Sequence, residues 1–222
     1  MFGPNKKVVN RYISSIVKGK SLVLDTRELG TSKALAKTNK KKDITVFGID
    51  PQLPKKCKRF GIKCVPGWSG EALDQLKRQK FDFIYLDYCG TPDGNVDFNP
   101  MEDMEKASLM LKRGGILAVT FCKRCPSVIS KCVNMCPDNL YMRRAFEYCD
   151  TSPMIFVAYT SKKIPRVGPP VGSIVKVIVK GKKCRGRVEE VFLDGVKLTH
   201  VDKHGKKLSE EHWEEPFSAI EV

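Results

Sequence analysis

Four short apolar runs, separated by polar segments, constrain the fold of this 222-residue chain more than any other feature. These runs cover residues 21–25, 44–50, 81–87 and 115–121, with a weaker run at 63–66. They are continuously apolar, as is typical of strands that are buried on both faces of a sheet. Segments of helical character lie between them, at residues 31–38, 69–79 and 101–111. Alternating strands and helices predict an α/β fold, a doubly wound and mostly parallel sheet with helices on both faces.

After residue 140 the pattern changes to a pair of short apolar runs. Residues 144–149 and 154–159 are joined by the turn-forming sequence Asp150-Thr151-Ser152-Pro153. This arrangement is typical of a hairpin, and it would close the sheet with an antiparallel edge. The first domain is therefore predicted to span residues 1–162.

A glycine and two prolines at 168–170 predict an extended linker over residues 163–170. Residues 171–222 then contain short strand-like runs separated by glycine turns. We predict four strands in this region, at 173–179, 183–192, 196–201 and 217–222. Such spacing resembles a small all-β domain, an SH3-like or Tudor-like barrel.

Trp213 lies among four glutamates in this second domain. The acidic surroundings would suit a cationic ligand bound through cation–π attraction. The alternative is that Trp213 belongs to the core of the barrel, which is the more common place for a single tryptophan in a small domain.

The net charge of +15 arises from 40 lysine and arginine residues against 25 acidic ones. The excess lies in the first 165 residues, with dense clusters at Lys40-Lys41-Lys42 and over residues 55–59. A basic domain of this kind favours a nucleic acid, RNA or DNA, as partner, because counterions are released when phosphates are neutralised. A solvated lysine-rich surface is the alternative.

No apolar run is long enough to cross a membrane, and the first residues lack the pattern of a signal peptide. We therefore expect an intracellular protein, cytoplasmic or nuclear, with no membrane partner. The nine cysteines are then expected to be reduced thiols.

Two of the cysteine pairs have spacing that resembles a zinc site: Cys122 with Cys125, and Cys132 with Cys136. Only six residues separate the pairs, fewer than zinc ribbons usually have. A packed cluster of thiols is the preferred interpretation, and we predict no metal site.

Acidic residues end three of the predicted strands: Asp25, Asp50 and Asp87. In an open α/β sheet, ligands bind beyond the carboxyl ends of the strands. The three carboxylates therefore indicate a nucleotide-type site, with Asp50 suited to accept hydrogen bonds from ribose hydroxyls. Capping of the following helices is the alternative role.

The segments 23–25, 48–51, 82–87 and 114–117, together with the closing hairpin, resemble successive motifs of class I S-adenosylmethionine-dependent methyltransferases. The resemblance implies S-adenosylmethionine as cofactor. It implies cofactor contacts from the first loop, the ribose site, the adenine site and the end of the 81–87 strand. These residues are Asp25, Gly30, Thr31, Asp50, Pro51, Trp68, Ser69 and Asp87.

One departure from that family lies in the first loop, residues 25–32. The family's loop is usually rich in glycine, because its backbone approaches the cofactor closely. Here Gly30 is the only glycine. A lost cofactor site is therefore an alternative, which would leave a catalytically silent nucleic-acid-binding module.

The sequence Leu86-Asp87-Tyr88-Cys89-Gly90-Thr91-Pro92 looks similar to the substrate motif of amino-directed methyltransferases, in particular the tRNA guanine-N2 enzymes. By this resemblance Asp87 would accept hydrogen bonds from the target amino group, and Tyr88 would stack on the base. A base amino group of RNA or DNA is thus the first predicted target.

The rival target is a ribose 2′-hydroxyl. Ribose 2′-O-methyltransferases surround that hydroxyl with a lysine, an aspartate, a second lysine and a glutamate. Asp87 and Lys123 match two of these, and Lys18 or Lys20 could supply the first lysine. The glutamate is missing, because Met154 occupies its region and Glu147 lies one strand earlier. Lys123 would alternatively contact a phosphate.

The prediction is therefore a methyltransferase acting on nucleic acid, with Asp87, Tyr88 and Lys123 as the catalytic residues. Positioning of the acceptor beside the methyl donor supplies most of the rate in such a displacement, so no strong base is required. A protein methyltransferase is a third hypothesis, in which the barrel would bind a protein partner.

Overall fold

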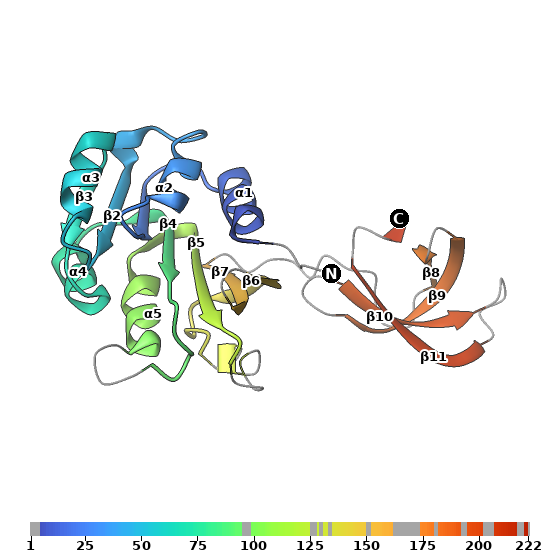
Figure 1. Cartoon of the computed structure of the whole chain (residues 1–222). Coiled ribbons are helices and arrows are strands. Elements are labelled where there is room, and N and C mark those ends of the chain that lie inside the picture. The colour runs from blue at the N-terminus through green and yellow to red at the C-terminus, as the bar shows by residue number, and fades with distance from the viewer. Residues whose placement is uncertain are drawn as a thin grey trace. The chain divides into compact units, whose positions relative to one another are not determined.

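The computed structural model describes residues 5–94, 99–124, 128, 131–132, 135–149 and 152–161, and the backbone alone of the strands beyond residue 173. The chain divides into two compact units, Met1–Lys163 and Ile164–Val222. Each unit contains its own sheet (Figure 1).

The first unit is built on a seven-stranded sheet of order β3-β2-β1-β4-β5-β7-β6. The strands β1 to β5 are mutually parallel, and β7 pairs antiparallel with both β5 and β6. The predicted parallel sheet with an antiparallel edge hairpin is thus confirmed. The strands are β1 (Ser21–Leu24), β2 (Ile44–Gly48), β3 (Lys63–Pro66), β4 (Phe81–Asp87), β5 (Leu111–Cys122), β6 (Tyr141–Cys149) and β7 (Pro153–Thr160).

Helices cover both faces of this sheet (Figure 1). One face carries α1, α2 and α3, whose apolar side chains form one core with the strands, and the other carries α4 and α5 over a second core. A short 3-10 turn, η1 (Lys41–Asp43), leads into β2. The helices are α1 (Lys6–Ile16), α2 (Gly30–Leu35), α3 (Leu53–Phe60), α4 (Ser69–Leu76) and α5 (Pro100–Leu109).

Two of these helices, α1 and α3, are absent from the sequence-based prediction. Helix α1 buries Val9 and Ile13, four residues apart, which is one turn of a helix. Helix α3 buries Leu53 and Cys57 at the same spacing and ends at Gly61, whose φ of 80° suits glycine. Each helix buries only two residues within a mostly polar segment, so neither contains the apolar run that would mark an element in the sequence.

The sheet order brings the predicted acidic residues to one edge of the sheet. Strands β1, β2 and β4 are parallel neighbours, so their carboxyl ends lie side by side. The chain order reverses at β1, which has β2 on one side and β4 on the other. Such a switch point is where open α/β sheets bind ligands.

Gly48 permits a close approach at this edge, and its replacement tests the packing there. A Cβ at this position would lie 2.9 Å from the carbonyl oxygen of Asp25 and 3.0 Å from a methyl group of Leu53. We expect Gly48→Ala to lower the free energy of unfolding by about 1–3 kcal/mol, because a backbone atom must move. A Cβ at Gly30 would lie no closer than 3.9 Å to Asn10, so Gly30→Ala should change stability by less than about 1 kcal/mol. Urea denaturation of both variants measures the difference, and equal losses would contradict this account.

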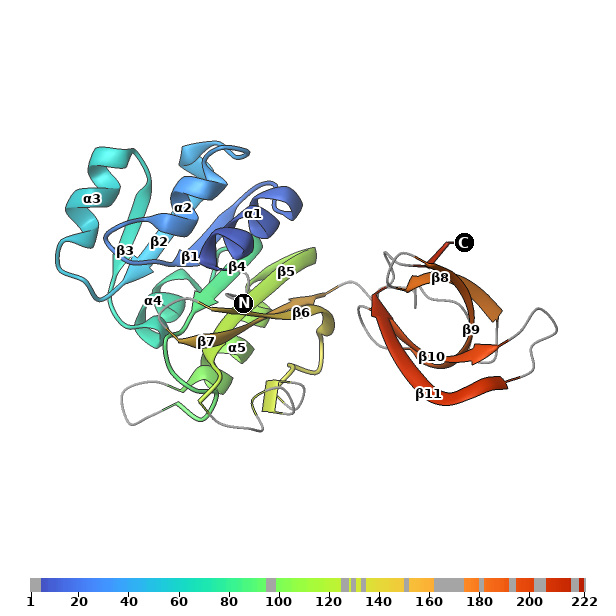
Figure 2. The same cartoon turned by 45° about the vertical axis from the view of Figure 1, so that its right-hand side comes forward.

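The second unit contains a five-stranded sheet of order β11-β10-β9-β8-β12. All its pairings are antiparallel, and its strands curve strongly (Figure 2). The strands are β8 (Ile174–Val179), β9 (Lys182–Val191), β10 (Gly195–Val201), β11 (Lys207–Pro216) and β12 (Ile220–Glu221).

The prediction of four strands in this unit was wrong, because it omitted β11. The omitted strand contains four glutamates and ends at a proline, a composition that disfavours strands in isolation. Its pairing with β10 places Glu214 opposite Lys197 and Trp213 opposite Leu198. Pairing with a neighbouring strand therefore overrides the local preference.

Among the residues described, no helix has the length and apolar character needed to cross a membrane.

Candidate active site

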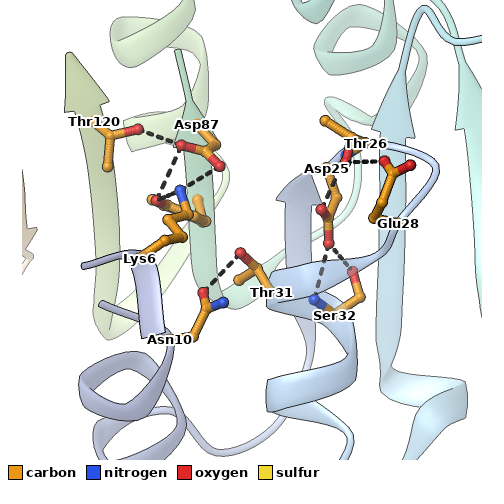
Figure 3. A network of polar contacts seen from close by, with 10 residues as sticks. Lys6, Asn10, Asp25, Thr26, Glu28, Thr31, Ser32, Asp87 and Thr120 are labelled. Atoms are coloured by element: carbon orange, nitrogen blue, oxygen red, sulfur yellow. Dashed lines mark hydrogen bonds and ion pairs between the residues drawn. The ribbon is translucent and has the colours of Figure 1, made fainter. Parts of the chain in front are cut away.

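The first loop is held together by the carboxylate of Asp25. One oxygen accepts hydrogen bonds from the backbone N–H and the hydroxyl of Ser32, at 2.9 and 2.8 Å, and the other accepts from the N–H of Thr26 at 2.9 Å (Figure 3). Burial raises the pKa of Asp25, and these hydrogen bonds oppose the increase. With both oxygens engaged inside the loop, Asp25 fixes the shape of the loop.

The neighbouring residues of this loop pack toward α1. Thr31 is buried, and its hydroxyl donates to the side-chain oxygen of Asn10 at 3.0 Å. Leu29 has a left-handed conformation, with φ 53° and ψ 41°, and its side chain is buried. A left-handed backbone costs a non-glycine residue about 1–2 kcal/mol. The glycine-poor loop therefore makes its turn at Leu29, and Gly30 begins α2.

Asp50 and Trp68 are accessible at the ends of β2 and β3. One oxygen of Asp50 accepts from the N–H of Gln52 at 2.8 Å, and the other lies 3.9 Å from Nε of Arg27. The Asp50 side chain is 30% exposed, and Pro51 beside it is exposed. Trp68 is 45% exposed. An accessible carboxylate and an accessible indole at adjacent strand ends are suited to a ribose and an adenine.

Ser69 was expected to flank the adenine site together with Trp68, but its side chain lies elsewhere. Its hydroxyl is buried and donates to the carboxylate of Asp103 on α5. Trp68 is the N-cap residue of α4, and its backbone N–H donates to Glu71 at 3.2 Å. Ser69 therefore joins α4 to α5 and does not face the strand ends.

Asp87 lies at the centre of a polar network at the end of β4 (Figure 3). Lys6, the first residue of α1, is 2.5 Å from one carboxylate oxygen. The other oxygen accepts from the hydroxyls of Thr120 and Tyr85, at 2.5 and 3.2 Å. The Lys6 ammonium also donates to the Tyr85 hydroxyl at 2.8 Å. Burial, then the nearby Asp87 charge, raises the pKa of Tyr85 well above its usual value, so it remains a neutral donor.

The Lys6–Asp87 pair is partly open to solvent, since the two side chains are 23% and 21% exposed. The sequence prediction missed Lys6, Thr120 and Tyr85. Lys6 precedes the strands by many residues, and only the packing of α1 brings it to the carboxyl edge. Thr120 and Tyr85 lie within strands, where apolar neighbours gave no sign of a polar role.

Tyr88 is buried, contrary to the expectation that it stacks on a base. Only 6% of its surface is exposed, its ring is stacked on Phe121 with centroids 5.6 Å apart, and its hydroxyl donates to Asp103 at 2.8 Å. This position makes Tyr88 part of the core behind the strand ends. The residue after Asp87 turns inward at the end of β4.

Asp103 accepts hydrogen bonds from both Tyr88 and Ser69 while it is almost completely buried. It thereby connects α5 to the first residue of α4 and to the end of β4. One buried carboxylate thus positions the segments that carry Trp68 and Asp87. Burial raises the pKa of Asp103, and the two hydrogen bonds only partly oppose this.

The raised pKa of Asp103 predicts a pH dependence of stability. Because the folded pKa exceeds the unfolded value of about 3.9, this group stabilises the fold most below that pH, and the contribution is lost as the pH rises through the folded pKa. The free energy of unfolding of the wild type, minus that of Asp103→Asn, should therefore fall as the pH rises from about 4. Urea denaturation over an acid-to-neutral series measures this, with exposed Asp74→Asn as control. A constant difference would contradict the assignment.

Lys123 forms an ion pair with Glu147, 2.5 Å apart, between the end of β5 and the second half of β6. The glutamate thus lies beside Lys123 although it belongs to the earlier strand of the hairpin. Lys18 and Lys20 were wrong candidates for the first lysine. Lys20 precedes β1 and donates to Gln79 at 2.8 Å, so both lie at the amino edge of the sheet.

Within the described residues, no three histidine, cysteine, aspartate or glutamate side chains gather as metal ligands. Of the four cysteines with zinc-like spacing, Cys125 lies outside those residues. Cys122 and Cys132 are buried, and the Cys136 thiol donates to the carbonyl oxygen of Leu140 at 3.5 Å.

No family profile and no curated protein matches this sequence. Solved structures do match its first unit. The N-methyltransferase NodS from Bradyrhizobium japonicum, solved with S-adenosyl-L-homocysteine, has 14% identity over 70% of this chain and 84% of its own, with a TM-score of 0.54. An rRNA methylase from Streptococcus thermophilus has 18% identity over 72% of this chain and 98% of its own, with a TM-score of 0.52. The chain has the class I methyltransferase fold.

TrmN from Thermus thermophilus shares this fold at 14% identity, with a TM-score of 0.50. The match covers 69% of the present chain and spans about half of TrmN, 47% of its length. The matched fold accounts for the strand order and for the antiparallel hairpin, whereas the second unit is additional to it.

Proposed function

We propose that the protein is an S-adenosylmethionine-dependent methyltransferase that acts on a nucleic acid. The observation that carries the proposal is the edge where accessible Asp50 and Trp68 lie on one side of β1 and the Lys6–Asp87 pair lies on the other. NodS, which has the same fold, was solved with S-adenosyl-L-homocysteine. The Streptococcus thermophilus protein is an rRNA methylase, and the basic charge of this chain suits such a substrate.

The residues at this edge fit the proposed cofactor. In the described part of the chain, no backbone group donates to the second carboxylate oxygen of Asp50, which can accept from ribose hydroxyls. Trp68 presents an exposed aromatic surface for the adenine. Asp25 would act by fixing the loop, and Thr31 by anchoring that loop to α1. When bound, S-adenosylmethionine supplies an electrophilic methyl group.

The polar network favours a ribose hydroxyl over a base amino group as the methyl acceptor. By the resemblance to ribose 2′-O-methyltransferases, Lys6 and Asp87, with Lys123 and Glu147, would supply the two lysines and two acids of a 2′-hydroxyl site. The Lys6 ammonium can hold the acceptor oxygen, and Asp87 is the nearest carboxylate to receive its proton. An amino target would instead use an exposed aromatic after Asp87, and Tyr88 is buried.

The second unit is proposed to be an SH3-like or Tudor-like barrel. Its strand order, a meander of four strands with a short fifth strand against the first, supports this proposal, as does the curvature of the sheet. We propose that it helps to hold the substrate. The side chain of Trp213 lies outside the described residues, so its cation-binding role stays a prediction.

We also propose that the protein acts inside the cell, in the cytoplasm or the nucleus. Cys57, Cys64 and Cys122 are reduced thiols, as suits a reducing compartment.

The function is tested by incubating the full chain with methyl-labelled S-adenosylmethionine and separate pools of RNA, DNA and protein. We expect label in RNA, within dinucleotides that resist alkali, because a methylated 2′-oxygen cannot attack the adjacent phosphate. Label released in mononucleotides would place the methyl group on a base instead. Label in protein alone would contradict a nucleic-acid substrate, and nucleic-acid binding without any transfer would identify a silent binding module.

A further inference from the structure

The charge of the first unit is separated across its sheet. Residues 33–63 contain ten lysines and arginines and two aspartates, whereas residues 69–109 contain four basic and nine acidic residues. The first segment includes α3 and the second half of α2, and the second includes α4 and α5 on the opposite face (Figure 1). One helical layer is therefore basic and the other acidic.

The basic side chains of residues 33–63 are all exposed, and none forms an ion pair with another described residue. Helix α3 contributes four of them, on the face opposite its buried residues Leu53 and Cys57. The Lys41 ammonium lies 4.2 Å from the ring centroid of Phe60, so η1 packs beside the end of α3. The α3 basic surface is defined as Lys41, Lys42, Lys55, Lys56, Lys58 and Arg59.

We propose that the α3 basic surface binds the phosphate backbone of the nucleic acid. Unpaired, exposed cations in this density cost free energy by mutual repulsion, and a polyanion relieves that repulsion and releases its own counterions. The acidic opposite layer repels the same polymer, so the charge separation orients it as it approaches. This proposal rests on the proposed function for its choice of polyanion.

The position of α3 also suits a substrate that reaches the strand ends. Helix α3 packs beside β3, which lies three strand spacings, about 14 Å, from β4. Its eight residues begin just beyond β2, at the carboxyl edge of the sheet, and extend for about 12 Å away from that edge. A nucleic-acid chain whose phosphates are bound along α3 can therefore place a nucleotide near Asp87, only a few nucleotides away from the bound phosphates.

A lipid surface is a poorer partner for the α3 basic surface. Membrane-binding segments usually combine basic residues with apolar side chains that enter the bilayer. Among the described residues of 33–63, the only exposed large apolar side chain is Ile49. The α3 basic surface therefore has the charge to bind a polyanion but few apolar side chains that could enter a bilayer.

The test compares two triple variants of the full chain with equal loss of charge. The first carries Lys55→Gln, Lys56→Gln and Arg59→Gln, and the control carries Lys77→Gln, Arg78→Gln and Arg113→Gln, which are exposed elsewhere. Fluorescence anisotropy with a single-stranded RNA of about 20 nucleotides is measured over a range of salt concentrations. For the first variant, the slope of log affinity against log salt should fall by about 2, with about 100-fold weaker binding near 0.1 M salt. The control should weaken less than about threefold.

Equal weakening in both variants would overturn the proposal, because it would assign the effect to net charge alone. Binding of the wild type to anionic phospholipid vesicles but not to RNA would also overturn it. The proposed function fails separately, when S-adenosylhomocysteine does not bind or no methyl group is transferred. If RNA binding depends on the α3 basic surface but no methyl group is transferred, the result supports this inference and not the proposed function.

Discussion

Replacement of Lys6 by methionine is expected to lower kcat for methyl transfer by about 10²–10³-fold, while affinity for S-adenosylhomocysteine stays within about twofold. Methionine keeps the apolar stem but removes the ammonium that pairs with Asp87 and contacts the Tyr85 hydroxyl. In the proposed site that ammonium holds the acceptor oxygen, so its loss should affect the chemical step more than cofactor binding. Initial rates with the RNA that the wild type methylates provide the measurement.

Lys7→Met is the matched control, because Lys7 is the next residue of the same helix and is exposed. It should retain at least about half of the wild-type rate, since an exposed cation contributes little. Thermal melting of both variants checks that α1 remains folded. A Lys6→Met enzyme with wild-type kcat would contradict the assignment of Lys6 and, with it, the preference for a ribose hydroxyl.

Replacement of Asp50 by alanine is expected to weaken S-adenosylhomocysteine binding by about 30–100-fold. Two hydrogen bonds from ribose hydroxyls to a charged carboxylate are worth about 2–3 kcal/mol together, which corresponds to that ratio. Fold stability should change little, because the 30% exposed carboxylate of Asp50 accepts one backbone hydrogen bond among the described residues, from the N–H of Gln52. Equilibrium titration of both proteins measures the ratio of dissociation constants.

Asp74→Ala serves as control for the Asp50 variant. Asp74 is an exposed carboxylate on α4 that pairs with Lys106 at 3.1 Å, so removing it changes the net charge equally. Its affinity should equal that of the wild type within about twofold. A similar affinity for the wild type and Asp50→Ala would place the ribose elsewhere or show that the edge binds another ligand.

The strand ends could be predicted from the sequence, because buried strands are continuous apolar runs and an aspartate lies at or just beyond the end of three of them: Asp25, Asp50 and Asp87. The contacts that these carboxylates make could not be predicted from the sequence. Whether Asp25 faces a ligand or its own loop depends on the turn at Leu29, where a left-handed conformation occurs without glycine. That conformation is decided by burial of the leucine side chain and not by local preference.

The partners of Asp87 likewise could not be predicted, although the position of Asp87 at the end of a strand could. Lys6 reaches Asp87 across 81 positions of the sequence because α1 packs on the sheet, and no spacing rule relates the two residues. Glu147 lies in the strand judged too early for it, yet the hairpin brings it to Lys123. Tyr88 follows Asp87 directly but turns into the core because Asp103 supplies a buried acceptor. Long-range packing therefore determines the candidate site, whereas the local pattern determines the sheet.

The central claim is that the carboxyl edge of the first sheet binds S-adenosylmethionine. Calorimetric titration of the full, folded chain with S-adenosylhomocysteine tests it most directly. We expect saturable binding to one site per chain, strongly weakened in Asp50→Ala. A wild-type protein that is folded by circular dichroism and shows no heat of binding at high ligand concentration would contradict the claim.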